Sequence, residues 1–175
     1  MSFLIGLRGE KHSMLKRPIF SPRANVRYTP IKEVVLRATY ASGYRAPQTY
    51  DEDLHVGAVG GEVSLIQLDP NLRPEMSHSV SASADWARKF GSWESNVTLE
   101  GFFTQLNDVF SLVENGHDAL GNLLLLRTNE KGARVYGMNL EGKVAYKSKF
   151  IFQLGYTYQQ SRYIEVVTWS ENPNI

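Results

Sequence analysis

Apolar and polar residues alternate strictly along most of this chain, and this period of two restricts its fold more than any other feature. Successive side chains of a β-strand point to opposite faces, so alternation gives one apolar face and one polar face. In residues 79–87, Val80, Ala82, Ala84 and Trp86 alternate with serines and an aspartate. The pattern recurs at residues 23–29, 33–41, 93–103, 136–146 and 150–158, and more weakly at residues 3–8. We therefore expect an all-β chain of about seven or eight antiparallel strands.

The links between these segments alternate between short and long. The short ones read TPIK, FGS and SK, and the long ones cover residues 10–18, 45–75 and 115–133. Because neighbouring strands of an up-and-down meander run antiparallel, this alternation places every long loop at one end of the sheet. Transmembrane β-barrels have this arrangement, with short periplasmic turns and long outer loops.

Aromatic residues form two groups on the apolar faces. Those beside the short links are Tyr28, Trp86, Trp93, Tyr146 and Phe150. Those towards the long links are Tyr40, Phe103, Tyr136 and Tyr158. Trp93 and Phe103 are about ten residues apart, which at about 3.3 Å per residue and a tilt near 40° spans roughly 25 Å. That is the height of the apolar band of an outer-membrane barrel between its two aromatic girdles, whereas a soluble sandwich has no reason to separate its rings in this way.

Charge and composition exclude several classes of function. The 175 residues carry 19 basic and 18 acidic side chains, a formal net charge of +1, which gives no electrostatic case for nucleic-acid binding. The absence of cysteine excludes disulfides and thiolate metal sites. The four histidines are scattered, with no acid or nucleophile at the spacing of a known catalytic motif. We therefore expect no enzyme, no catalytic residue and no cofactor.

The polar faces carry large charged side chains, namely Arg37, Asp85, Glu100, Glu141 and Lys143. Such groups suit a wide, wet or plugged lumen better than the packed interior of a small barrel. The chain also ends at WSENPNI, in what reads as a loop. We therefore expect a segment of a larger transmembrane barrel, with a smaller closed, porin-like channel as an alternative.

Four motifs, in the same order along the chain, resemble those of the TonB-dependent outer-membrane receptors. The first is GYRAP at Gly43–Pro47, and the second is LDPNLRPE at residues 68–75, with DPN where NP is common. The third covers residues 100–114, and the fourth covers residues 129–141, with Asn139 in place of the usual glutamate. The matching residues of the last two are Leu106, Val109, Asn129, Ala133, Gly137 and Glu141. The resemblance extends over about residues 20–165.

This resemblance implies a 22-stranded barrel that holds a plug domain in the bacterial outer membrane. Residues 1–175 would be an internal segment of the C-terminal half of that barrel, without the plug. Their sequence is most similar to those of receptors from Bacteroidetes. The implied function is import of a scarce large solute, such as a ferric siderophore, cobalamin or a glycan. The implied partners are outer-membrane lipid, the plug and the rest of the barrel, TonB acting through the plug, and the extracellular solute.

The longest link carries the candidate residues for contact with the solute. Its arginine, tyrosine, acidic and histidine side chains suit capture at the outer surface, so we expect contacts from Arg45, Tyr50, Asp51, Glu52, Asp53 and His55. The spacing of the acids matches no EF-hand loop, and we assign no metal to them. We interpret the GYRAP motif itself as structural and not as a ligand-binding motif. Its Pro47 ends strand pairing because proline lacks the backbone N–H that pairing needs.

A soluble β-sandwich that recognises carbohydrate on its long loops is the alternative of a different class. One structural observation separates it from the barrel. If the apolar faces of all strands are exposed as one continuous belt, they cannot be the core of a sandwich.

Overall fold

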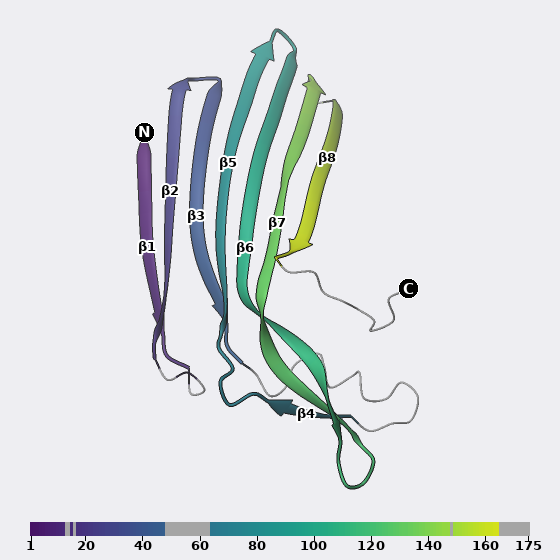
Figure 1. Cartoon of the computed structure of the whole chain (residues 1–175). Coiled ribbons are helices and arrows are strands. Elements are labelled where there is room, and N and C mark those ends of the chain that lie inside the picture. Colours follow the sequence, from purple (N-terminus) through teal and green to yellow (C-terminus); the bar gives the residue numbers. More distant parts are fainter. Residues whose placement is uncertain (13–14, 16, 48–63, 148, 165–175) are drawn as a thin grey trace.

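The computed structural model describes residues 1–12, 15, 17–47, 64–147 and 149–164. These residues form one curved sheet (Figure 1), and no helix long and apolar enough to cross a membrane occurs among them. The strands are β1 (Ser2–Glu10), β2 (Ile19–Ile31), β3 (Val34–Arg45), β4 (Ser64–Leu68), β5 (Glu75–Phe90), β6 (Trp93–His117), β7 (Leu123–Tyr146) and β8 (Phe150–Tyr163). The all-β, largely antiparallel prediction is thus confirmed.

The order of the strands in the sheet follows their order in the chain, with one exception. Strands β1, β2, β3, β5, β6, β7 and β8 each pair antiparallel with the next. The short strand β4 instead pairs in parallel with the loop-side part of β7, from Leu123 to Arg127. Strands β8 and β4 therefore occupy the same edge of β7 at different heights. The sequence pattern does not predict β4.

The register confirms the predicted two faces. Leu36, Ala84, Leu99, Leu140 and Tyr156 are direct cross-strand partners on β3, β5, β6, β7 and β8. Because the side-chain period of a strand is two, this single row fixes the phase of all five strands. We call the face that carries this row the apolar face and the opposite one the polar face. The weakly patterned first segment joins the same face, since its residues pair with the apolar residues of β2.

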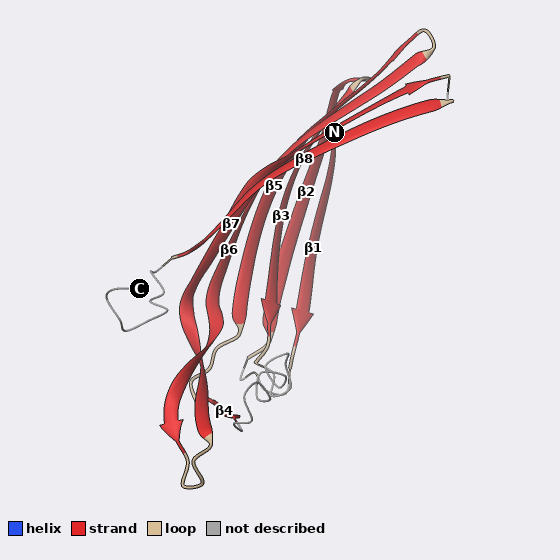
Figure 2. Cartoon of the chain, turned by 90° about the vertical axis from the view of Figure 1, so that its right-hand side faces the viewer, coloured by secondary structure: helices blue, strands red, loops and turns tan. Residues whose placement is uncertain are grey.

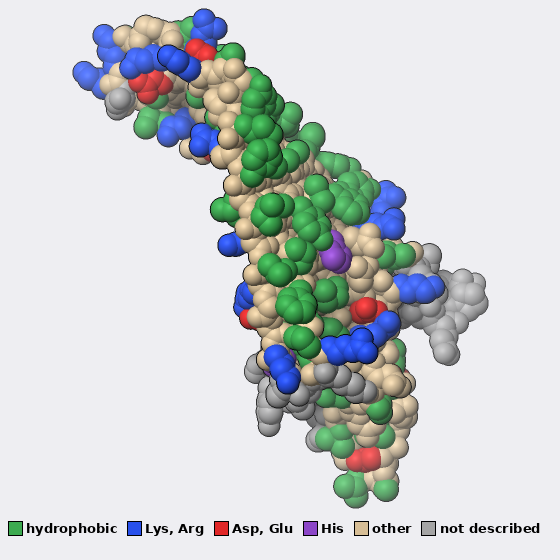
Figure 3. All heavy atoms as spheres, turned by 90° about the vertical axis from the view of Figure 1, so that its left-hand side faces the viewer, with side chains coloured by type: hydrophobic (Ala, Val, Ile, Leu, Met, Phe, Trp, Pro, Cys, Tyr) green, Lys and Arg blue, Asp and Glu red, His purple; other side chains and the backbone are tan. Residues whose placement is uncertain are grey.

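The apolar face is exposed over its whole length. Ala46 is the one buried hydrophobic residue among those described, whereas Leu99 is 49% exposed and Leu154 is 66% exposed. Figure 3 shows hydrophobic side chains running continuously along one side of the sheet, with Lys and Arg gathered near both ends. A sandwich buries its apolar residues between two sheets. With a single sheet and an exposed apolar belt, the carbohydrate-binding sandwich has no support here.

Short and long connections lie at opposite ends of the sheet, as predicted. We call them the turn end and the loop end (Figures 1 and 2). The prediction of a long link at residues 115–133 is wrong, because β6 continues to His117 and β7 begins at Leu123. The two strands, of 25 and 24 residues, form a hairpin that extends beyond the loop end of the neighbouring strands (Figure 2).

Polar side chains on the polar face bond to one another across the strands. Arg37 pairs with Asp85, and the Thr98 hydroxyl donates to the second carboxylate oxygen of Asp85 at 2.8 Å. Farther across the sheet, Asn139 Nδ2 donates to Glu100 Oε2 at 3.1 Å. Cross-strand contacts of this kind stabilise a sheet whose polar face has no second layer against it.

Candidate functional site

The first of two groups of polar residues at the loop end is a cluster centred on Glu75, the first residue of β5. Its carboxylate accepts from Arg45 Nε at 2.7 Å and Nη2 at 3.2 Å, and from the backbone N–H of Phe110 at 2.6 Å. Arg45 ends β3, so register brings it directly opposite Glu75. The guanidinium carbons of Arg45 and buried Arg127 lie 5.0 and 5.1 Å from the centre of the Phe110 ring. Glu75 therefore joins the last residue of β3 to the extended β6–β7 hairpin.

Asn129 makes the second connection of this cluster. Its Oδ1 accepts from the backbone N–H of Arg73 at 2.7 Å, and its Nδ2 donates to the carbonyls of Arg73 at 2.9 Å and Asp108 at 2.7 Å. Arg73 also forms an ion pair with Asp108, with 2.7 Å between Nη2 and Oδ1. The side-chain amide thus satisfies backbone groups of two segments at once, as an Asn with both donors and an acceptor can. We call the seven residues Arg45, Arg73, Glu75, Asp108, Phe110, Arg127 and Asn129 the rim cluster.

The backbone of the hairpin changes conformation beside the rim cluster. Asp108 has φ 56° and Gly132, on the facing strand, has φ 125°. A Cβ on Gly132 would overlap the carbonyl oxygen of Leu106, so only glycine fits there without movement of the backbone. From this point the hairpin twists away from the rest of the sheet, as Figure 1 shows. The position of the outer hairpin therefore depends on this pair and on the rim cluster together.

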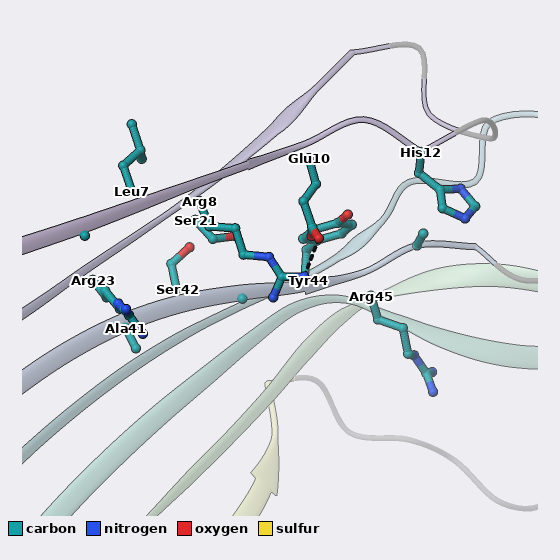
Figure 4. Close-up of a pocket in the computed structure, with 13 residues that line it drawn as sticks. Leu7, Arg8, Glu10, His12, Ser21, Arg23, Ala41, Ser42, Tyr44 and Arg45 are labelled. Atoms are coloured by element: carbon teal, nitrogen blue, oxygen red, sulfur yellow. Dashed lines mark hydrogen bonds and ion pairs between the residues drawn. The ribbon is translucent and has the colours of Figure 1, made fainter.

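The second group lines a hollow of about 820 Å³ at the loop end of β1, β2 and β3. Arg8 and Tyr44 both bond to the carboxylate of Glu10, and Figure 4 shows these three side chains close together. Arg23 crosses β1 at Gly6, where an added Cβ would come within 2.8 Å of its Nε. We call Arg8, Glu10, Arg23 and Tyr44 the wall group. Arg8, Glu10 and Arg23 belong to the polar face by register, whereas Tyr44 shares the phase of Leu36 on β3 and bonds to Glu10 at the end of β1.

At the tip of the hairpin, one carboxylate organises the turn. Asp118 Oδ1 accepts the backbone N–H groups of Leu120 and Asn122, each at 2.8 Å, and its Oδ2 accepts Asn122 Nδ2 at 2.8 Å. The side-chain bond from Asn122, together with the backbone bonds, holds the pKa of the Asp118 carboxyl below its ordinary value. This fixed turn limits how far the hairpin tip can change shape.

Of the predicted solute contacts, the structure places Arg45. Its side chain points away from the wall group in Figure 4 and bonds to Glu75 instead. The other five, Tyr50, Asp51, Glu52, Asp53 and His55, lie outside the described residues. Sequence reasoning missed the wall group. The alternation of Arg8 and Glu10 with apolar neighbours was its signal, but the first segment carries that pattern only weakly.

No cluster of three or more histidine or acidic residues within the described ranges is arranged to hold a metal ion. The polar groups described at the loop end offer hydrogen bonds and charged side chains.

Comparisons with known proteins agree with this geometry. Residues 1–174 match the family described as TonB dependent receptor-like, beta-barrel. Among solved structures, the siderophore receptor PirA from Pseudomonas aeruginosa is 22% identical with a TM-score of 0.70, over 91% of this chain and 31% of that one. The PirA receptor from Acinetobacter baumannii is 18% identical with a TM-score of 0.62, over 90% of this chain and 25% of that one.

The hemophore receptor HasR from Serratia marcescens, solved with its hemophore and heme, is 15% identical with a TM-score of 0.61. That match covers 91% of this chain and 29% of the receptor. The chain thus spans less than a third of the length of each of these structures. At such identities the likeness concerns the fold alone. No curated protein matches the chain.

Proposed function

Because the chain belongs to the family of TonB-dependent receptor-like β-barrels, we propose that it forms part of the wall of an outer-membrane receptor that imports a scarce, large solute. Members of this family are transport receptors and not enzymes. In the proposed receptor a plug domain closes the lumen, and TonB supplies energy by acting on the plug. The plug, TonB and the solute are therefore the proposed partners of the assembled protein.

The single observation that carries the proposal is the exposed apolar belt between two aromatic rows. The turn-side row contains Trp93, Tyr146 and Phe150, which are consecutive cross-strand partners, and the rings of Trp93 and Tyr146 lie 4.8 Å apart. The loop-side row contains Phe103 and Tyr136, also cross-strand partners. In water such a belt would cost solubility, whereas in a bilayer its apolar side chains face acyl chains and its aromatics reach the headgroups.

The proposed orientation follows from the two ends of the sheet. Outer-membrane barrels have short periplasmic turns and longer extracellular loops, so the loop end would face the outside of the cell. The wall group and residues 45–75 then lie where an external solute first meets the barrel. In this proposal the wall group contacts the solute, and Arg45, Tyr50, Asp51, Glu52, Asp53 and His55 assist its capture.

Iron chelates are the first substrate class to test. Two of the solved structures described above are named as siderophore receptors, and a third is a hemophore receptor bound to heme. The chain resembles them in fold, which supports the class without specifying a particular chelate. The guanidiniums of Arg8 and Arg23 would complement the acidic groups of such a chelate.

The test is uptake of ⁵⁵Fe-labelled siderophores and of heme by a bacterium deleted for the gene and complemented with the complete receptor. We expect deletion to abolish uptake of at least one chelate and complementation to restore it. A variant with Asp51, Glu52 and Asp53 all changed to Ala should bind that chelate more weakly while assembling normally. A control variant with Glu33 and Glu94 both changed to Ala removes two acids at the turn end and should leave affinity unchanged. Unchanged uptake of every chelate after deletion would contradict the proposed substrate class.

A further inference from the structure

A polar row lies on the apolar face, one step beyond the loop-side aromatic row. Its members are direct cross-strand partners on β3, β5, β6, β7 and β8, namely Ser42, His78, Gln105, Arg134 and Arg162. The preceding row, nearer the turn end, contains Tyr40, Val80, Phe103, Tyr136 and Gln160. The apolar face therefore changes from apolar and aromatic to polar within one step along the strands.

Two arginines in this row face each other directly. Arg134 on β7 is the cross-strand partner of Arg162 on β8, both are exposed, and both belong to the same face. Within the described residues, neither forms an ion pair with a carboxylate. Like charges placed directly opposite each other destabilise a sheet. An anion between the two guanidiniums would convert this repulsion into two charge-assisted contacts.

The neighbouring side chains add oriented hydrogen-bonding groups. Tyr136 donates its hydroxyl to Gln160 Oε1 at 2.6 Å, and Gln160 Nε2 donates to the Tyr158 hydroxyl at 2.5 Å. Arg162 Nη2 reaches the same amide oxygen at 3.3 Å. This chain of bonds holds Arg162 beside two aromatic rings. The next cross-strand pair towards the turn end is Met138 and Tyr158, and both are exposed. A ligand here would meet apolar surface on one side and two cations on the other.

We propose that Arg134 and Arg162, with Tyr136, Tyr158 and Gln160, bind the phosphate of an anionic lipid in the outer leaflet of the membrane. The inference rests on the proposed function, because it requires the apolar face to contact lipid. The site lies on the face opposite Arg8, Glu10 and Arg23, so a solute in the lumen cannot reach it. A phosphorylated lipid fits both the apolar surface and the two cations of the site. Its acyl chains would lie along the apolar belt, and its phosphate would lie between the arginines.

The experiment uses the complete receptor, purified in a neutral detergent after its assembly has been verified by resistance to protease. Native mass spectrometry measures the affinity for phosphorylated lipid A and for phosphatidylcholine, with and without excess inorganic phosphate. We expect preference for lipid A and no competition by inorganic phosphate. The double variant Arg134→Gln, Arg162→Gln should lose about tenfold or more in affinity for lipid A. The control Arg27→Gln, Lys143→Gln removes the same charge from the polar face and should keep the native affinity.

Equal affinity of the two double variants for lipid A would overturn the inference, as would full competition by inorganic phosphate. Its failure is distinguishable from failure of the proposed function. Normal chelate uptake without lipid preference removes the lipid site alone. Lipid preference that requires the two arginines, in a receptor that imports no chelate, supports the lipid site and contradicts the proposed substrate class.

Discussion

Replacing Leu99 with arginine tests whether the apolar face contacts lipid. Leu99 lies in the middle of the belt, 49% exposed, with Ala84 and Leu140 as its cross-strand partners. It is six residues from Trp93 and four from Phe103 along β6. At about 2.5 Å of height per residue on a tilted strand, it is about 15 Å from one aromatic row and about 10 Å from the other. The Leu99→Arg substitution would therefore place a guanidinium close to the bilayer midplane.

The expected cost follows from that depth. An arginine facing lipid near the midplane of a β-barrel costs about 2–4 kcal/mol, which corresponds to about a 30- to 700-fold fall in the ratio of folded to unfolded protein. The matched control is Glu100→Arg, one residue away on the polar face. Glu100 accepts a single 3.1 Å hydrogen bond from Asn139, so its loss should cost about 1 kcal/mol.

The assay is urea-dependent folding of the complete receptor into phosphatidylcholine vesicles, with folded protein identified by its heat-modifiable migration on gels. Assembly in cells, measured by the same gel shift in outer-membrane fractions, provides a second readout. We expect Leu99→Arg to lower both strongly and Glu100→Arg to lower both slightly. Equal losses in the two variants would refute the assignment of lipid-facing and lumen-facing sides, because only the face distinguishes the two positions.

Three further predictions concern the loop end. Glu75→Gln should lower the opening free energy of the Phe110 amide by about 1 kcal/mol, since a neutral amide oxygen replaces the charged carboxylate as its acceptor; hydrogen exchange measures it. Gly132→Ala should cost about 1–3 kcal/mol in urea unfolding, because alanine is strained at φ 125°. Asp118 has a lowered pKa in the folded protein, so its stabilisation of the turn is complete above about pH 4 and is lost as the pH falls through the folded value. Exchange of the Asn122 amide, corrected for its intrinsic rate, should therefore accelerate in acid.

Each of these predictions has its own control. Glu114→Gln lies on an exposed part of the same hairpin and should leave the Phe110 amide protected. Gly155→Ala adds a Cβ with nothing within 4 Å, and a loss of stability as large as that of Gly132→Ala would contradict the argument from strain. In Asp118→Asn the protection of Asn122 should no longer change with pH, and a pH dependence like the native one would assign the effect to another group.

The strands, their faces and the separation of short from long connections could be read from the sequence. Alternation is a local property, so the residues from Val80 to Trp86 reveal a two-faced strand without knowledge of their partners. The exposure of the apolar face was predicted from the spacing of Trp93 and Phe103, because two aromatic rows about 25 Å apart match a bilayer and not a core. The register then confirmed that apolar residues on neighbouring strands share this face.

The arrangement at the loop end was decided by the tertiary structure. The motifs containing Arg45, Glu75 and Asn129 were recognised one by one, but their contacts join residues 30 and 56 positions apart. The sequence predicts a link at residues 115–133, whereas pairing with β6 makes most of these residues strand. Strand β4 depends likewise on a parallel partner about 60 residues away. Alternation shows which face of a strand is apolar. The length of a strand and the partner of a loop depend on distant segments of the chain that come into contact only when the sheet has formed.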